Sequence, residues 1–404
     1  MRYNWMMETR RVSNEPTPLS MTTGLKKRWP ILITGTILLA FSWQDASALI
    51  PDRRRSFDER RENVYMIIPA IASLPGAGVF AGILGSFSNI NGTGIDAAVT
   101  QAETIDSESD IHVRAFALRE IPLLIPGLTF EYWFGDIKFD DYSTYLPGRN
   151  SPNFTIPYKG EFDYFLLHPV WRLFDRRINL SYYLIYFKGF SVNEDGYEEE
   201  IGQHSARGEV LLDLTDDVVD PRTGIRLRYS YSLKAPEKSI LGKDSVNAAD
   251  AEKEDITTRN LELSLYFPIT QQFTLVYYHQ QFEAAGREET DEIVTGGRLE
   301  LRGYPGGRWS DRYGMVNTLE GRYTIPTNTN IDIYLINGVL EGIQLAAFYE
   351  TGQVSPKKND DLFKDLHQSY GFGIRALIEA IVFRLDFAFS NEGAETHLTI
   401  DQPF

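Results

Sequence analysis

The chain has 404 residues, of which 43% are hydrophobic, enough for one large domain or two ordinary ones. It contains no cysteine, which excludes disulfide bonds and thiolate chemistry. The formal net charge of −16 argues against a nucleic-acid-binding protein, because such proteins present a basic surface.

The N-terminal 48 residues have the composition of an export signal. A basic Lys-Lys-Arg run at 26–28 precedes an apolar stretch at 30–42, and Ala-Ser-Ala at 46–48 matches a cleavage site. A membrane-spanning helix needs about 20 apolar residues, so an uncleaved membrane anchor is the weaker alternative. We therefore predict a signal peptide over 1–48, followed by a short periplasmic linker over 49–63.

The remaining chain alternates apolar and polar residues, the pattern of half-buried strands. After Gly224 the apolar members are Ile225, Leu227, Tyr229, Tyr231 and Leu233. The same alternation recurs at 261–269, 383–389 and 398–404, where Phe404 is expected to share the apolar face. Further candidate strands in the first half lie at 79–88, 93–101, 111–118, 128–137, 161–167 and 178–188.

The connections between these segments alternate in length. Short connections are predicted at 216–223, 268–272 and 377–380, long ones at 234–256, 283–314 and 351–369, and intermediate ones at 326–342 and 390–395. Alternation of side chains alone does not separate a soluble sandwich from a membrane barrel, but short periplasmic turns alternating with long extracellular loops are typical of bacterial outer-membrane barrels. Residues 64–404 have room for about 16 such strands.

The predicted fold is therefore all-β. No apolar stretch after residue 48 is long enough for a membrane helix, so any membrane crossing is by strands. We predict one domain over residues 64–404, a transmembrane antiparallel β-barrel in the bacterial outer membrane.

One long loop carries a distinctive motif, Arg302-Gly303-Tyr304, within 299–308. Other motifs follow or precede it in a fixed order: the turn with Asp220, Pro221 and Gly224, then 317–322, 348–352, 370–375, 383–386 and the C-terminal strand signal Phe404. Together these segments resemble the BamA/TamA superfamily of outer-membrane barrels, also called the bacterial surface antigen family.

The resemblance implies that the loop at 283–314 folds into the barrel lumen, where its arginine meets an acidic residue of the wall. Alternation along the neighbouring strands turns Glu350, Glu320 and Arg322 inward. A guanidinium fork can engage two carboxylates, so we expect Arg302 to bind Glu350, with Glu320 as a second acceptor. The family usually has aspartate where this chain has Glu350. We expect Arg302 to hold the loop more strongly than Arg308 does.

The resemblance also implies a function in inserting or translocating proteins at the outer membrane, through a weak seam between the first and last strands. Its partners would be client outer-membrane proteins, membrane lipid and lipopolysaccharide. Family members that assemble proteins carry periplasmic domains before the barrel, whereas only the linker 49–63 precedes the barrel here, as in a barrel-only member. The alternative is a passive channel or structural barrel without assembly activity.

Enzymatic activity, a metal and a cofactor are not expected. The six histidines show no metal-ligand spacing, and we find no Ser–His pair of the kind a barrel lipid-modifying enzyme needs. Three acidic stretches, at 198–200, 252–255 and 288–292, are expected in outer loops. They are read as solvated charge, with divalent cations that bridge lipopolysaccharide as the alternative role.

Overall fold

The computed structural model describes residues 62–74, 78–105, 111–145, 148–152, 155–192, 198–236, 256–285, 293–295, 300–358, 360–378, 381–400 and 402–404. The predicted signal peptide and almost the whole linker lie outside these residues. Within them the only helices are short 3-10 turns, and none is long and apolar enough to cross a membrane.

A single antiparallel sheet of 16 strands makes up the fold, and strands adjacent in sequence pair in space. The strands are β1 (Val64–Leu74), β2 (Gly78–Ser88), β3 (Asp96–Thr104), β4 (His112–Pro122), β5 (Leu128–Tyr145), β6 (Thr155–Leu173), β7 (Ile178–Val192), β8 (Glu198–Asp213), β9 (Gly224–Pro236), β10 (Ile256–Pro268), β11 (Phe273–Ala285), β14 (Tyr313–Ile333), β15 (Ile336–Ser355), β16 (His367–Ile378), β17 (Ile381–Phe389) and β18 (Ala394–Ile400). Two short strands in the β11–β14 connection, β12 (Ile293–Thr295) and β13 (Trp309–Asp311), form a separate ladder.

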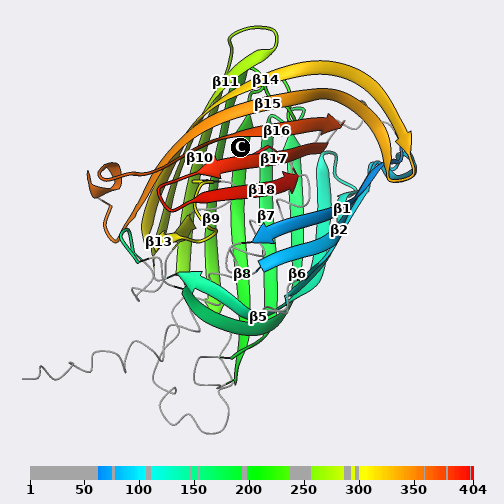
Figure 1. Cartoon of the computed structure of the whole chain (residues 1–404). Coiled ribbons are helices and arrows are strands. Elements are labelled where there is room, and N and C mark those ends of the chain that lie inside the picture. Colours follow the sequence, from blue (N-terminus) through cyan, green and yellow to red (C-terminus); the bar gives the residue numbers. More distant parts are fainter. Residues whose placement is uncertain are drawn as a thin grey trace, which may run out of the picture.

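The sheet closes through β1 and β15. Tyr65 pairs with Asn337 and Met66 with Ile336, so 13 strands form the ring and β16–β18 continue the sheet outside it. Figure 1 shows the long β14–β15 hairpin arching over the barrel towards β1. β18 approaches β1, yet the described residues contain no pairing between them. The predicted number of strands is thus roughly right, but the ring is closed by an earlier strand than the last one.

Most predicted strands exist, and the differences have local causes. Each of the six candidate strands in the first half overlaps one of β2–β7. The predicted connection at 326–342 is wrong: β14 and β15 both run through it, and a register shift between Pro326 and Thr329 accommodates the proline. β1 was not predicted because Val64–Leu74 is almost entirely apolar rather than alternating. The acidic stretch 198–200 begins β8 and pairs with β7, so its placement in an outer loop is wrong.

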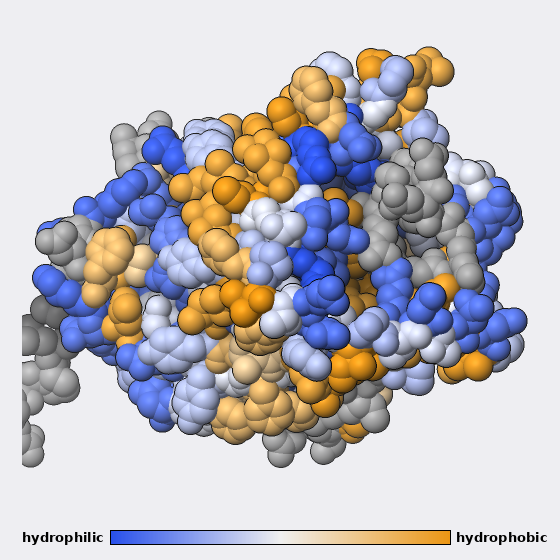
Figure 2. Space-filling view, turned by 90° about the horizontal axis from the view of Figure 1, so that it is seen from above, coloured by the Kyte–Doolittle hydropathy of each residue, from blue (hydrophilic) through white to orange (hydrophobic). Residues whose placement is uncertain are grey.

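The two faces of the sheet differ sharply in polarity. In β9, Leu227 and Tyr229 are 37% and 44% exposed, whereas Arg226 and Ser230 are 4% and 5% exposed. Because the sheet closes on itself, the buried polar face is the inside of the barrel. Viewed from above, apolar side chains gather in patches on the surface (Figure 2). This arrangement is the reverse of a soluble sandwich, whose buried face is apolar.

Candidate functional site

The Arg302 motif lies in a buried segment between β12 and β13. Leu301, Arg302 and Tyr304 are each at most 1% exposed. A tight turn forms the motif: the Tyr304 amide donates to the Leu301 carbonyl at 2.9 Å, and Leu301 has a left-handed φ of 49°. This turn aims the Arg302 side chain at the buried face of the sheet.

Arg302 binds three carboxylates from three strands. Its Nε donates to Glu350 of β15 at 2.8 Å, its Nη2 to Glu320 of β14 at 3.1 Å, and its Nη1 to Asp386 of β17 at 2.7 Å. The Arg302 backbone amide donates to the second Glu350 oxygen at 2.6 Å. Burial alone would lower the pKa of Arg302, but these carboxylates outweigh it and raise that pKa.

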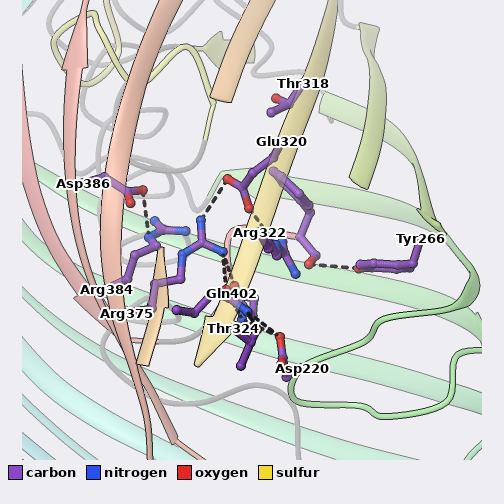
Figure 3. A network of polar contacts seen from close by, with 12 residues as sticks. Asp220, Tyr266, Thr318, Glu320, Arg322, Thr324, Arg375, Arg384, Asp386 and Gln402 are labelled. Atoms are coloured by element: carbon purple, nitrogen blue, oxygen red, sulfur yellow. Dashed lines mark hydrogen bonds and ion pairs between the residues drawn. The ribbon is translucent and has the colours of Figure 1, made fainter. Parts of the chain in front are cut away.

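Three further arginines bind two of these carboxylates, Glu320 and Asp386 (Figure 3). Glu320 accepts from Arg322 Nε at 2.7 Å and lies 2.8 Å from Arg375 Nη2, while Arg384 Nε lies 3.1 Å from Asp386. All of these side chains are at most 1% exposed. Buried charges of this kind stabilise a protein only when they are paired, so each member fixes the position of the others.

The structure therefore brings Arg302 together with Glu350 and Glu320, the two carboxylates that strand alternation turns inward. Buried Gln344, Ala346 and Phe348 share the face of Glu350, as expected from the same alternation. Sequence reasoning missed Asp386, Arg384 and Arg375 as members of the network. The signal for the first two was present, because both lie on the polar side of an alternating strand.

The other residues of the motif also make specific contacts. Gly303 passes so close to β17 that a Cβ there would lie 2.5 Å from the Phe389 carbonyl oxygen. The Tyr304 hydroxyl donates to Asn391 at 2.7 Å, and His397 of β18 lies 2.7 Å from the Arg302 carbonyl oxygen. The loop thus reaches β17, β18 and the connection between them.

Arg308 forms a second anchor for the same loop. Its Nε and Nη2 donate to the Glu392 carboxylate at 2.7 and 2.8 Å, and its Nη1 donates to Ser151 at 3.0 Å. Its guanidinium also lies 3.8 Å from the centroid of the Trp309 ring. Since Arg308 is only 2% exposed, it is a structural partner of Arg302 and unsuitable as a neutral control.

The turn between β8 and β9 reaches the far side of the barrel. Asp220 accepts hydrogen bonds from Gln344 of β15 at 3.0 Å and from Gln402 at 3.3 Å. Pro221 is buried beside Asp220. Gly224 has φ 118°, and a Cβ there would lie 2.3 Å from the Leu214 carbonyl oxygen. The predicted turn residues therefore hold this connection against β15 and the C-terminal segment.

Phe404 lies beyond the last strand, which ends at Ile400. Its side chain is 2% exposed, its ring stacks on Tyr278 with centroids 4.8 Å apart, and its carbonyl accepts from the Tyr266 hydroxyl at 3.0 Å. The expectation that Phe404 shares the outer apolar face of the last strand is wrong. The chain leaves the sheet after β18 and turns inward, beside Arg322.

In the part of the chain that the structure describes, no group of three His, Asp or Glu side chains is arranged to hold a metal ion. The network around Arg302 instead consists of four arginines and three carboxylates that pair with one another. Their chemistry is that of a structural lock that connects a loop to the barrel wall.

Comparison with solved structures finds similar barrels. BamA from Haemophilus ducreyi lacking POTRA domains 1–3 matches with a TM-score of 0.51 and 12% identity, over 91% of this chain and 77% of that chain. CdiB from Escherichia coli matches at 0.58 and 12% identity, over 84% of this chain and 62% of the other. CdiB from Acinetobacter baumannii matches at 0.54 and 12% identity, over 84% and 59%.

The chain thus spans about three-fifths of the length of the two CdiB proteins that it matches. No protein-family model matches the sequence, and no curated protein is similar to it. At 12% identity, the likeness to BamA and CdiB shows a shared barrel fold.

Replacing Arg302 by alanine should destabilise the barrel, because it leaves buried Glu350 without the arginine that it binds. We expect a loss of roughly 3–5 kcal/mol in the free energy of unfolding, measured by urea titration of the refolded protein in lipid vesicles. Arg114→Ala is the matched control, since that side chain is 60% exposed while also pairing with an aspartate. Equal losses in the two variants would contradict the role of Arg302.

Asp220 should give stability a specific pH dependence. Burial raises the pKa of its carboxyl more than nearby Arg322 and the hydrogen bond from Gln344 lower it. An acid with a raised folded pKa contributes stability that is complete below its unfolded pKa, near 3.8, and that is lost as pH rises through the folded pKa. Asp220→Asn removes this contribution.

We therefore expect the stability of the wild type relative to Asp220→Asn to fall as the pH is raised from about 3 to about 8. Free energies of unfolding at several pH values measure this difference. Asp332→Asn, at an exposed position of β14, is the control. The same pH slope for both variants would show that the burial of Asp220 has no such effect.

Proposed function

We propose that this chain is a non-enzymatic outer-membrane β-barrel of the BamA/TamA superfamily that inserts or translocates polypeptides at that membrane. The observation that carries the proposal is the Arg302-Gly303-Tyr304 loop, fixed to β14, β15 and β17 by Arg302 and three carboxylates. A barrel that serves only as a pore has no need of a loop locked to its wall in this way.

The polarity of the two faces supports a membrane location. Leu319, Tyr323 and Ile325 of β14 are 48%, 44% and 45% exposed, while Glu320 and Arg322 between them are buried. Outer-membrane barrels present an apolar band to lipid and polar side chains to the lumen. The partners of the outer face would be membrane lipid and lipopolysaccharide. The acidic stretches 252–255 and 288–292 lie outside the described residues, so their predicted role in such contacts stays a prediction.

The loop acts in this proposal as a plug of the lumen. Segment 300–308 is anchored at Arg302 and again at Arg308, which binds Ser151 and Glu392. Arg308 joins the segment to the β5–β6 and β17–β18 connections, and Arg302 joins it to β14, β15 and β17. Such a plug keeps ions from leaking through a barrel whose function is to admit protein strands.

The junction between β1 and β18 is the proposed working surface. β1 pairs with β15 through its first residues, and β18 has β17 as its partner in the sheet. Unpaired strand edges are templates for another strand. A client β-strand would add to one of these edges by main-chain hydrogen bonds, a mode of recognition that requires little sequence specificity. Client outer-membrane proteins are therefore the proposed partners.

The test is deletion of the gene from its host, followed by quantitative proteomics of the outer membrane. We expect the abundance of a subset of outer-membrane proteins to fall by severalfold. Wild-type protein and the exposed control Arg114→Ala should restore them, and Arg302→Ala should not. Normal abundance of every outer-membrane protein in the deletion strain would instead support the alternative, a passive channel or structural barrel.

A further inference from the structure

A second group of buried charges lies inside the barrel, on β5–β9 rather than on β14–β17. It lines a cavity bounded by these five strands and by the turns at 174–177 and 214–223. Four of the lining side chains are arginines, one is His168, and three are carboxylates. The arginines of the lining thus outnumber its carboxylates by one.

The carboxylates of this cavity are already engaged. Asp213 accepts from Arg226 Nε at 3.0 Å and from the Thr215 amide at 3.0 Å. Glu131 accepts from Arg119 Nε and from His168 Nδ1, both at 3.1 Å. These carboxylates position the cationic groups and offer little negative charge of their own to a ligand.

A distortion of β4, the strand next to β5, positions side chains that support the cavity wall. Arg119 and Glu120 are consecutive, yet both are buried, because the register shifts between Leu118 and Ile121. A regular strand would turn one of the two outward. Glu120, with a left-handed φ of 58°, binds Arg172 on the neighbouring wall of the cavity. The strand thus adopts an unusual conformation at the place where it holds an arginine against the cavity.

Two buried nitrogen atoms in the cavity wall have no hydrogen-bond partner among the described residues. They are Nη1 of Arg226, whose side chain is 4% exposed, and Nε2 of His168, whose side chain is 6% exposed. Since His168 Nδ1 faces Glu131 and Arg226 Nε faces Asp213, the engaged atoms fix both side chains and leave the other nitrogens for a ligand. Buried polar atoms normally have partners, so each of these nitrogens is a candidate contact for a ligand in the cavity.

We propose that this cavity binds a phosphate group. A phosphate offers oxygens that accept from Arg226 Nη1 and from the neighbouring arginines, whose planar forks match oxyanions. A protonated phosphate oxygen can also donate to His168 Nε2, which is an acceptor when Nδ1 holds the proton. The two bounding turns lie at the opposite end of the strands from the Arg302 loop, so the cavity lies towards that end of the barrel. Free phosphate and a phospholipid headgroup share this chemistry.

The test is calorimetric titration of the refolded full-length protein, in a phosphate-free detergent at constant ionic strength, with inorganic phosphate. His168→Gln retains an amide that can donate to Glu131 but removes the imidazole nitrogen, and Arg226→Gln removes the guanidinium. Each should weaken binding at least tenfold. Arg259→Gln, at a side chain 54% exposed outside the cavity, should bind like the wild type.

A second titration with dihexanoyl phosphatidylglycerol, below its micelle concentration, identifies the source. Tighter binding of the lipid indicates a headgroup, and tighter binding of inorganic phosphate indicates a free anion; either supports the site. No saturable binding of either compound by the wild type overturns the proposal. Wild-type affinity in both His168→Gln and Arg226→Gln, with fold checked by circular dichroism, also overturns it.

Discussion

The guanidinium of Arg302 connects parts of the barrel that the backbone alone leaves separate. Glu320 and Glu350 lie on strands of the closed 13-strand ring, whereas Asp386 lies on β17, outside that ring. One side chain therefore ties a loop, the ring and the three continuing strands together. Because the Arg302 guanidinium is removed from water, its charge must be compensated by carboxylates in good hydrogen-bonding geometry. The neighbouring arginines share Glu320 and Asp386 with Arg302, which extends the pairing over several strands.

The same lock explains how a barrel whose last strand pairs with β17 alone, among the described residues, keeps its shape. Ring closure depends on a few pairs between β1 and the start of β15, at the end of a long hairpin. β18 and β1 approach each other without hydrogen bonds among the described residues. His397 of β18 is nevertheless held by the Arg302 carbonyl, and Asp386 of β17 by its guanidinium. β17 and β18 are thus held in place by Arg302, while the free edge of β18 at the β1–β18 junction remains available for pairing with another strand.

Strand alternation predicted much of the fold and part of the site. It correctly predicted that Glu350, Glu320 and Arg322 point inward, and it identified the polar face of β17 that carries Asp386. It did not connect Asp386 to Arg302, since two residues 84 positions apart share no local pattern. That pairing depends on where the buried loop meets the sheet in the folded chain.

The failures have similar causes. Phe404 fits the alternation of β18, but the chain leaves the sheet after Ile400, and burial against Tyr278 decides its direction. The cavity on β5–β9 could not be predicted from the sequence, because the side chains that support its wall depend on a register shift in β4. This shift turns both Arg119 and Glu120 inward. Period-two reasoning assigns such neighbours to opposite faces.

The most direct test of the central claim is single-channel conductance of the refolded barrel in planar bilayers. The wild type is compared with Arg302→Ala and with a deletion of 299–309. If Arg302 locks the loop across the interior, the wild type gives small, flickering currents, and both variants give larger and steadier ones. A large, steady conductance in the wild type would mean an open pore and would contradict the lock.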